Sequence, residues 1–218
     1  MVNIAKNATV RDTTRPNGGP IALMPDVAGP PPPVVGRAAA LSPVMGGMTT
    51  TAPGAASAKA ARYLLAGIRI ALGWIFLWAF LDKTFGLGFA TTSERAWVNG
   101  GSPTKGFLAF AASGPFEGMY HQIAGQTWAD WLFMIGLLGI GVGLLLGIAM
   151  RVTAASGVLL LVLMWTVVLP PANNLFMDDH LIYALVLVLL AAIGAGHTLG
   201  LGSRWVQIPI VRRNPWLR

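Results

Sequence analysis

The sequence predicts an all-α integral membrane protein, a bundle of four transmembrane helices with a disordered N-terminal tail and a partly helical outer loop. Composition is the first observation: 55% of the 218 residues are hydrophobic and 11% are charged, whereas soluble domains carry about 25% charged residues. The mean hydropathy of +0.64 agrees with a membrane protein. The second observation is that four apolar segments each approach the ~20 residues that cross a bilayer core of ~30 Å. They span about 63–82, 128–150, 152–169 and 180–200.

Residues 1–58 precede the first apolar segment and are rich in Pro, Gly, Ala, Thr and Ser. Neither a helical nor a strand period runs through them, so they cannot bury a core and are predicted to be disordered. Residues 59–204 form the predicted transmembrane domain, and residues 205–218 form a basic C-terminal tail. The second and third segments adjoin at Arg151, which predicts a tight helical hairpin.

Lysine and arginine are unequally divided between the two sides of the predicted bundle. Eleven lie on one side, and three, Lys83, Arg95 and Lys105, lie on the other. Because cytoplasmic flanks carry the excess of basic residues, both termini are predicted to be cytoplasmic. The net charge of +7 is interpreted as topology and attraction to membrane lipid, and no nucleic-acid partner is expected because no basic stripe with interleaved aromatic residues is present.

The loop after the first segment is predicted to contain a short amphipathic helix. Ser102 suits the N-cap and Pro103 the first helical position. Gly114 and Pro115 end this helix, and a second short turn is predicted over 119–124.

Glycines recur at four-residue spacing in the second segment, at Gly139, Gly143 and Gly147, and again in the fourth, at Gly196 and Gly200. Small residues at this spacing allow helix backbones to approach closely in lipid. They predict a helix-packing face, and a ligand groove walled by backbone is the alternative.

Arg69 lies inside the first segment, seven residues after Arg62 and therefore about 10 Å deeper. No acidic residue lies near it in the same half of the membrane, and ionisable residues within a membrane often mark functional sites. Three interpretations follow: the side chain reaches lipid phosphate, it bonds backbone carbonyls and His197, or it faces a bound anion or a quinone carbonyl.

Five polar residues are expected on the outer side, because Asp82 and Lys83 end the first segment and Asp178, Asp179 and His180 begin the fourth. If these two segments adjoin, the five form one polar cluster. Capping of the fourth helix accounts for one aspartate. The second aspartate and the histidine, which titrates near neutral pH, can transfer protons to a reducible ligand.

The chain has no cysteine, so it supplies no thiol relay, iron–sulfur ligand or cysteine-based zinc site. His180 and His197 are seventeen residues apart, about 25 Å along one helix, and cannot bind the same metal. No metal is expected, and any redox chemistry requires a bound small molecule or a partner.

Three separated blocks resemble the DoxX/DoxD family of four-helix bacterial membrane proteins. They are "RIALGWIFLWAFLDKTFGLGF", "NGGSPTKGFLAFAASGPF" and "NNLFMDDHLIYALVLVLLAAIGAGHTLGLG", within about residues 62–204. The family's first-helix signature falls on Arg69, Gly73, Trp74, Asp82 and Lys83.

The resemblance implies a subunit of a quinone-linked oxidoreductase in the bacterial inner membrane, of the thiosulfate:quinone type. The candidate catalytic residues are Asp179, His180, Asp82, Lys83 and Arg69, and the candidate quinone-binding residues are Arg69 and Trp74. In this interpretation Lys83 attracts an anionic donor, Asp179 or His180 handles quinone protons, and Arg69 orients a quinone oxygen.

The partners expected from the resemblance are membrane lipid and a second redox subunit, in a homo- or hetero-oligomer. The alternative function is a non-catalytic membrane scaffold that recruits a redox or oxidative-stress enzyme through its cationic tail. Whether the chain is itself an enzyme therefore stays open at the level of sequence.

Overall fold

A computed structural model describes residues 54–218 and shows an all-helical chain with no β-strand in that range. Its α-helices are α1 (Ala55–Phe85), α2 (Lys105–Phe110), α3 (Glu117–Ile123), α4 (Thr127–Leu146), α5 (Met150–Val167), α6 (Asp179–Ala192), α7 (Gly202–Trp205) and α8 (Pro209–Arg213). Short 3-10 turns separate them: η1 (Ser93–Arg95), η2 (Trp97–Asn99), η3 (Gly114–Phe116), η4 (Ala195–His197) and η5 (Pro215–Leu217). The predicted disorder of residues 1–53 lies outside the described residues.

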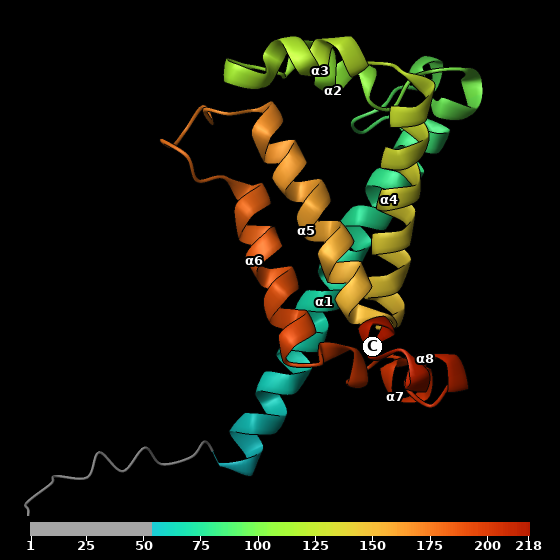
Figure 1. Cartoon of the computed structure of the whole chain (residues 1–218), viewed down its shortest axis with the longest axis vertical. Coiled ribbons are helices and arrows are strands. Elements are labelled where there is room, and N and C mark those ends of the chain that lie inside the picture. Colours follow the sequence, from blue (N-terminus) through green and yellow to red (C-terminus); the bar gives the residue numbers. More distant parts are fainter. Residues whose placement is uncertain (1–53) are drawn as a thin grey trace, which may run out of the picture. The chain divides into compact units, whose positions relative to one another are not determined.

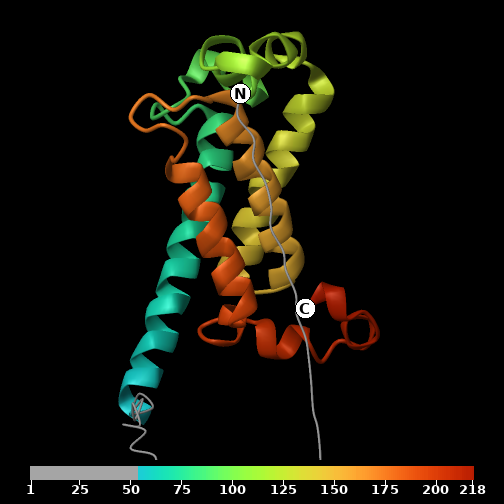
Figure 2. The ribbon, with the colours of Figure 1, turned by 60° about the vertical axis from the view of Figure 1, so that its left-hand side comes forward.

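Three of the helices, α1, α4 and α5, are long and apolar enough to cross a membrane. The first of them, α1, begins at Ala55, inside the stretch predicted to be disordered, because the alanine-rich run "AASAKAA" favours helix. With 31 residues it is about 46 Å long, and it projects beyond the other helices at its N-terminal end (Figures 1 and 2). Three of the four predicted apolar segments are therefore confirmed as helices long enough to cross a membrane.

The fourth apolar helix, α6, is shorter than predicted. It has 14 residues, which is about 21 Å and less than the ~30 Å core of a bilayer. The helix ends because Gly194 adopts a left-handed conformation with φ of 65°, after which the chain turns through η4. The predicted segment 180–200 is thus a helix only over its first two thirds.

The predicted tight hairpin between the second and third segments is present as the α4–α5 connection. The turn occupies residues 147–149, and Arg151 already belongs to α5. Gly147 has a φ of 67° and donates from its amide to the Leu144 carbonyl at 3.2 Å. A left-handed glycine at this place is the usual end of a helix.

The helices pack in the order α1 against α4, α4 against α5, and α5 against α6, and α6 also contacts α1 (Figure 1). Their shared core is buried and apolar, as expected for a bundle. It consists of Leu72, Phe76, Met134, Leu137, Ile140, Leu144, Met150, Ala154, Leu161, Ala184, Leu187, Leu190 and Ala195.

The helices α1 and α4 approach each other closely because each carries a glycine that faces the other helix. A Cβ on Gly73 would lie 2.9 Å from the Leu145 backbone nitrogen, and one on Gly141 would lie 2.8 Å from the Leu77 nitrogen. The predicted packing glycine Gly139 has no atom within 4 Å of its Cβ position, so it does not pack. The other predicted packing glycines do meet close neighbours: Gly143 faces the Thr153 side chain of α5, and Gly147 faces Gly196.

The two ends of the bundle carry different short helices (Figures 1 and 2). At one end α2 and α3 form a cover, which we name the cap (residues 102–125). At the other end the chain after α6 folds back across the bundle, and we name this part the base (residues 194–218). The segment 205–218, predicted as a tail, contributes α8 and η5 to the base, where Val211 is fully buried.

The predicted amphipathic helix of the outer loop is present as α2, but it begins later than expected, at Lys105. The Ser102 hydroxyl accepts a hydrogen bond from the Lys105 amide at 3.1 Å. The second predicted turn is the helix α3, which begins at Glu117 directly after η3.

Candidate functional site

Arg69 is the most deeply buried charged side chain among residues 54–218, with no exposed surface. Its Nη1 donates to the carbonyl oxygens of Leu144 and, at 3.1 Å, Leu145. Its Nη2 donates to the carbonyl oxygens of Thr198 at 3.3 Å and Leu199 at 2.8 Å. The guanidinium group is thus enclosed by backbone oxygens from two separate parts of the chain.

Three of these four carbonyls, those of Leu145, Thr198 and Leu199, have no backbone donor within residues 54–218, whereas the Leu144 carbonyl also accepts from the Gly147 amide. Leu144 and Leu145 lie in the last turn of α4, where carbonyls have no partner within the helix. The end of a helix also carries a partial negative charge, which favours a cation there. Thr198 and Leu199 lie in the irregular part of the base. Arg69 therefore ties α1 to the end of α4 and to the base.

Of the three interpretations of Arg69, the structure shows the bonding of backbone carbonyls. Complete burial is incompatible with a side chain that reaches lipid phosphate. His197 is not its partner, because the His197 ring lies 3.4 Å from the Ser203 hydroxyl and is exposed. One atom of Arg69, Nε, is buried without a hydrogen-bond partner among the described residues.

Asp82 and Lys83 have different surroundings although they are adjacent. The Asp82 carboxylate is buried and accepts hydrogen bonds from the amides of Phe89 at 3.2 Å and Ala90 at 3.0 Å. It therefore holds the loop that follows α1. Lys83 is half-buried, and its Nζ lies 5.9 Å from the centre of the Phe133 ring on α4, a cation–π arrangement.

The trio at the start of α6 is dominated by Asp178, the N-cap of the helix. One carboxylate oxygen accepts from the His180 amide at 3.1 Å and the Leu181 amide at 3.3 Å. The other lies 2.6 Å from His180 Nδ1. Asp178 thus serves as the N-cap of α6 and also positions the His180 ring, whereas Asp179 is exposed.

Trp74 does not share a site with Arg69. The two residues are five positions apart on α1, which is about 140° around the helix axis. Arg69 faces the interior, whereas Trp74 is 51% exposed and its ring is 5.7 Å from that of Trp78 on the outer surface. The two predicted quinone-binding residues therefore do not face a common site.

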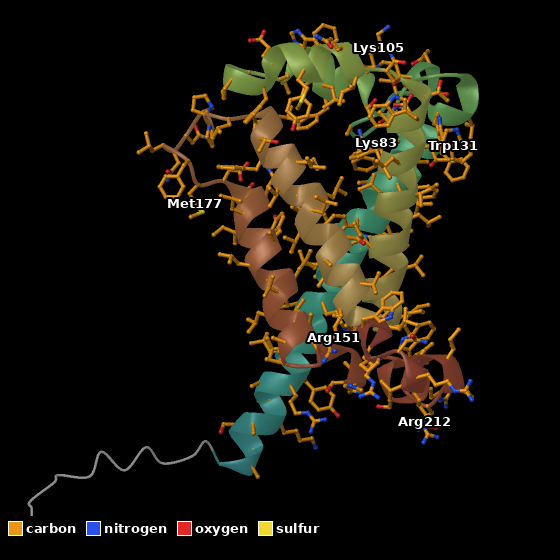
Figure 3. The ribbon with its side chains drawn as sticks, in the orientation of Figure 1. Lys83, Lys105, Trp131, Arg151, Met177 and Arg212 are labelled. Atoms are coloured by element: carbon orange, nitrogen blue, oxygen red, sulfur yellow. The ribbon has the colours of Figure 1, made fainter. Side chains whose placement is uncertain are left out.

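The five predicted catalytic residues occupy three separate places. Arg69 lies towards the base, Asp82 and Lys83 lie at the end of α1 beside α4, and Asp178 to His180 lie at the start of α6. Figure 3 shows Lys83 beside the top of α4 and Met177, next to Asp178, on the far side of α5. No hydrogen bond or ion pair among residues 54–218 joins the two outer groups, so the single predicted polar cluster does not form.

A polar site that the sequence interpretation missed lies between the cap and α4. The Asp130 carboxylate is buried in the first turn of α4. One of its oxygens accepts from the Ser102 hydroxyl at 2.8 Å, the Thr104 amide at 3.0 Å and the Thr104 hydroxyl at 2.6 Å. The motif Ser102-Pro103-Thr104 signals an acceptor nearby, since two hydroxyls are available at the start of a short helix.

A groove of about 1030 Å³ lies between α4 and α5, below the cap. Most of its lining is apolar, including Trp128, Leu132 and Ile135 of α4 and Leu159 of α5, and these four side chains are more than half exposed. Gly139 and Gly143, which the sequence assigned to packing or a backbone-walled groove, line it, as do Gly136, Ser156 and Tyr120. The alternative of a backbone-walled groove thus holds for Gly139.

Most hydroxyl groups in this groove already have protein partners. The Tyr120 hydroxyl lies 2.5 Å from the Thr166 hydroxyl, and the Thr104 and Thr153 hydroxyls bond to Asp130 and to the Ile148 carbonyl. Ser156, which is exposed on α5, forms no hydrogen bond with the described residues. No cluster of three or more His, Asp or Glu side chains among residues 54–218 is placed to hold a metal ion.

None of the family models, curated proteins or solved structures compared with the chain matches it. The fold and the geometry define a helical membrane protein with an apolar groove and a separate polar base. The resemblance to DoxX/DoxD proteins stays a prediction from the sequence blocks.

Proposed function

We propose that the protein is a four-helix integral membrane subunit of a quinone-linked oxidoreductase, and that the groove between α4 and α5 holds the quinone. The observation that carries this proposal is the groove itself, a space of about 1030 Å³ with an apolar lining that opens on exposed faces of two long apolar helices. A lipid-soluble ligand can enter such a groove from the bilayer without crossing water.

The short helix α6 completes the fourth crossing together with the chain up to residue 201. Irregular backbone is tolerated at membrane depth only where protein satisfies its polar groups. Here Arg69 donates to the Thr198 and Leu199 carbonyls, and the Leu201 amide donates to the Leu146 carbonyl at 2.7 Å. Because basic residues are in excess on the side of the base, we place the base in the cytoplasm and the cap on the outer side of a bacterial inner membrane.

Ser156 is the group that we assign to recognition of a quinone carbonyl. A quinone head carries two carbonyl acceptors, and Ser156 is a groove-lining hydroxyl with no partner among the described residues. An unpaired hydroxyl in an apolar setting costs free energy, so a ligand that accepts its hydrogen bond is favoured. This replaces the predicted quinone contacts of Arg69 and Trp74, which face different sides of α1.

The electron donor proposed from the resemblance is thiosulfate. Two thiosulfate ions form one tetrathionate and release two electrons, and the quinone takes up these electrons with two protons to become a quinol. Because the chain has no cysteine, no thiol of this chain carries the sulfur. We therefore assign donor oxidation to a second redox subunit. Asp179, exposed and not used in capping, is the group proposed to exchange protons with water.

Labelling with a photoreactive azidoquinone tests the site. We expect label in peptides of α4 and α5, its loss in Gly139→Phe, and retention in Gly67→Phe. Both glycines are exposed and have no atom within 4 Å of their Cβ positions, but only Gly139 lines the groove. Ser156→Ala should weaken competition by unlabelled quinone about tenfold, which corresponds to one lost hydrogen bond of ~1.4 kcal/mol. Equal labelling of wild type and Gly139→Phe would overturn the site.

Thiosulfate-dependent quinone reduction in membranes that contain the chain and its partner tests the reaction. Asp179→Ala should slow this reduction, and Glu117→Ala, an exposed acid on α3, should not. Absence of donor-dependent reduction in the complete membranes would rule out the oxidoreductase assignment.

The scaffold function is a second candidate, and one observation favours it. The predicted catalytic acid Asp82 is bound to backbone amides and serves the fold, and the ring of the predicted catalytic His180 is held by the N-cap Asp178. Deleting residues 1–53 distinguishes the two functions. A scaffold loses its partner in co-purification, whereas a quinone-binding subunit keeps its azidoquinone labelling.

A further inference from the structure

A second concavity lies at the base, on the opposite end of the bundle from the cap. It has a volume of about 500 Å³ and is formed by the α4–α5 turn, the end of α6, η4 and the helices α7 and α8. Its polar lining includes Arg151, Arg212, Arg218 and His197. Figure 3 shows Arg151 and Arg212 together at this end. We name this space the base pocket.

The base pocket is strongly positive, because three arginines line it and no acidic residue does. A terminal carboxylate on Arg218 would cancel one of these charges and leave two. Every acidic residue of the described part lies at the cap end of its helix or in the loops there: Asp82, Glu94, Glu117, Asp130, Asp178 and Asp179. No acidic side chain within residues 54–218 therefore serves as a counterion for the arginines of the base.

The arginines are held close together by the backbone. The Arg151 amide donates to the Arg218 carbonyl at 2.9 Å, and Arg151 Nη1 donates to the Pro215 carbonyl at 3.0 Å. The Trp205 indole donates to the Leu217 carbonyl at 2.6 Å. These bonds fix the final turn η5 against α5 and α7, so Arg151 and Arg218 line one pocket, which Arg212 also lines. Such an arrangement is favourable when an anion lies between them.

The buried charge of Arg69 adds to this potential from behind one wall of the pocket. Gly147 and Gly196 form that wall, and a Cβ on Gly147 would lie 2.8 Å from the Gly196 carbonyl and 2.9 Å from Arg69 Nη1. The neighbours of Arg69 are carbonyl groups rather than carboxylates. No acidic side chain of the described part neutralises Arg69, the carbonyl dipoles offset only part of its charge, and one layer of glycine backbone separates it from the pocket.

The surface around the base pocket suits the boundary between lipid and water. Ile210 and Trp216 are each more than 60% exposed, and Ile210 lies on the same short helix as Arg212. Exposed apolar and aromatic side chains beside arginine are typical of segments that lie at the level of lipid headgroups. At that depth the anions at hand are phosphate groups.

We infer that the base pocket binds a phosphate ester, with the guanidinium groups of Arg212 and Arg218 as its ligands. Guanidinium groups match phosphate oxygens through paired, charge-assisted hydrogen bonds. The phosphate can belong to the headgroup of an anionic phospholipid or to a soluble phosphate ester. This site differs from the quinone groove between α4 and α5, with which it shares only the lining residue Ala149 of the α4–α5 turn.

Lipid retention measured by native mass spectrometry of the full chain in detergent tests the inference. The probes are phosphatidylglycerol, phosphatidylcholine and inorganic phosphate. The variant is R212Q/R218Q, and the matched control is R213Q, because Arg213 is exposed on the same helix as Arg212 but does not line the pocket. All three side chains are exposed, so the fold should persist. If the double variant fails to fold, R212Q alone replaces it.

We expect the wild type to retain phosphatidylglycerol in preference to phosphatidylcholine. The double variant should lose about tenfold in affinity, equivalent to ~1.4 kcal/mol, and R213Q should change it less than about twofold, as for an exposed charge. Displacement of the lipid by millimolar phosphate would assign the site to soluble esters, and no displacement would assign it to lipid. Equal losses in R212Q/R218Q and R213Q, or equal retention of both lipids, would overturn the site.

Discussion

Replacement of Arg69 by methionine should destabilise the bundle substantially, because Arg69 joins three parts of the chain through backbone carbonyls. Methionine is of similar length and apolar, so it fills much of the space without donating hydrogen bonds. Leu144 keeps a second donor, the Gly147 amide at 3.2 Å. Three carbonyls, those of Leu145, Thr198 and Leu199, then lose the donor that Arg69 supplies.

The magnitude follows from two opposing terms. Each of these part-buried carbonyls costs about 1–3 kcal/mol when it loses its donor, which gives roughly 3–9 kcal/mol for three. Removing a buried charge recovers several kcal/mol of desolvation free energy. The net loss is about 2–4 kcal/mol. Since 1 kcal/mol shifts the midpoint of a domain of this size by about 2–4 °C, the expected decrease is roughly 4–16 °C.

Thermal unfolding in detergent, followed by circular dichroism at a fixed scan rate, measures this decrease. The matched control is Arg62→Met on the same helix, where the side chain is exposed and the change should stay within ~0.5 kcal/mol. If R69M and R62M unfold within about 1 °C of each other, the carbonyl clamp contributes nothing and the reasoning fails. Arg69 would then be free for the ligand-binding role that the sequence suggested.

Three further predictions test other contacts by comparing matched positions in detergent. G141A should lower the unfolding free energy by about 1–3 kcal/mol, because the added Cβ meets the Leu77 backbone. The matched control G136A adds a Cβ with no atom within 4 Å and should leave the unfolding free energy unchanged. Similar unfolding midpoints for the two variants would contradict the close packing of α1 against α4. D178A should lower the unfolding free energy by about 0.5–2 kcal/mol through loss of the N-cap of α6, and D179A should leave it unchanged. Thermal unfolding of the two variants measures the difference. D130A removes three hydrogen bonds between α4 and the cap and should raise the rate of amide hydrogen exchange in residues 102–125. Unchanged exchange would show that Asp130 does not hold the cap.

Hydropathy predicted the positions of the long helices well, because α1, α4 and α5 are continuous apolar runs with polar flanks. It could not predict where α6 ends. Residues 194–202 contain four glycines, and each is compatible either with a packed helix or with a turn. Gly194 ends the helix since it adopts a left-handed conformation, and that choice depends on the α4 end and Arg69 against which the following loop packs.

The candidate site was predicted less well, although two of its errors could have been avoided. Helical geometry alone places Arg69 and Trp74 about 140° apart, so a shared ligand site was improbable from the start. Asp82 is followed by Gly86 and Gly88, both with positive φ, and such glycines allow a loop to return its amides to a carboxylate. The pairing of Asp130 with Ser102 and Thr104 could not be predicted, because it joins residues 26 to 28 positions apart.

Charged residues at the ends of membrane helices either stabilise the fold or bind an ionic ligand, and their contacts distinguish the two roles. At the cap end, Asp82, Asp130 and Asp178 each accept several hydrogen bonds from amides or hydroxyls, so most of their capacity is used by the fold. At the base, Arg212 and Arg218 share a pocket with no acid. Since a cluster of like charges is stabilised by an external anion and a capped carboxylate has little left to bind, the base is the end of the molecule where an ionic ligand is expected.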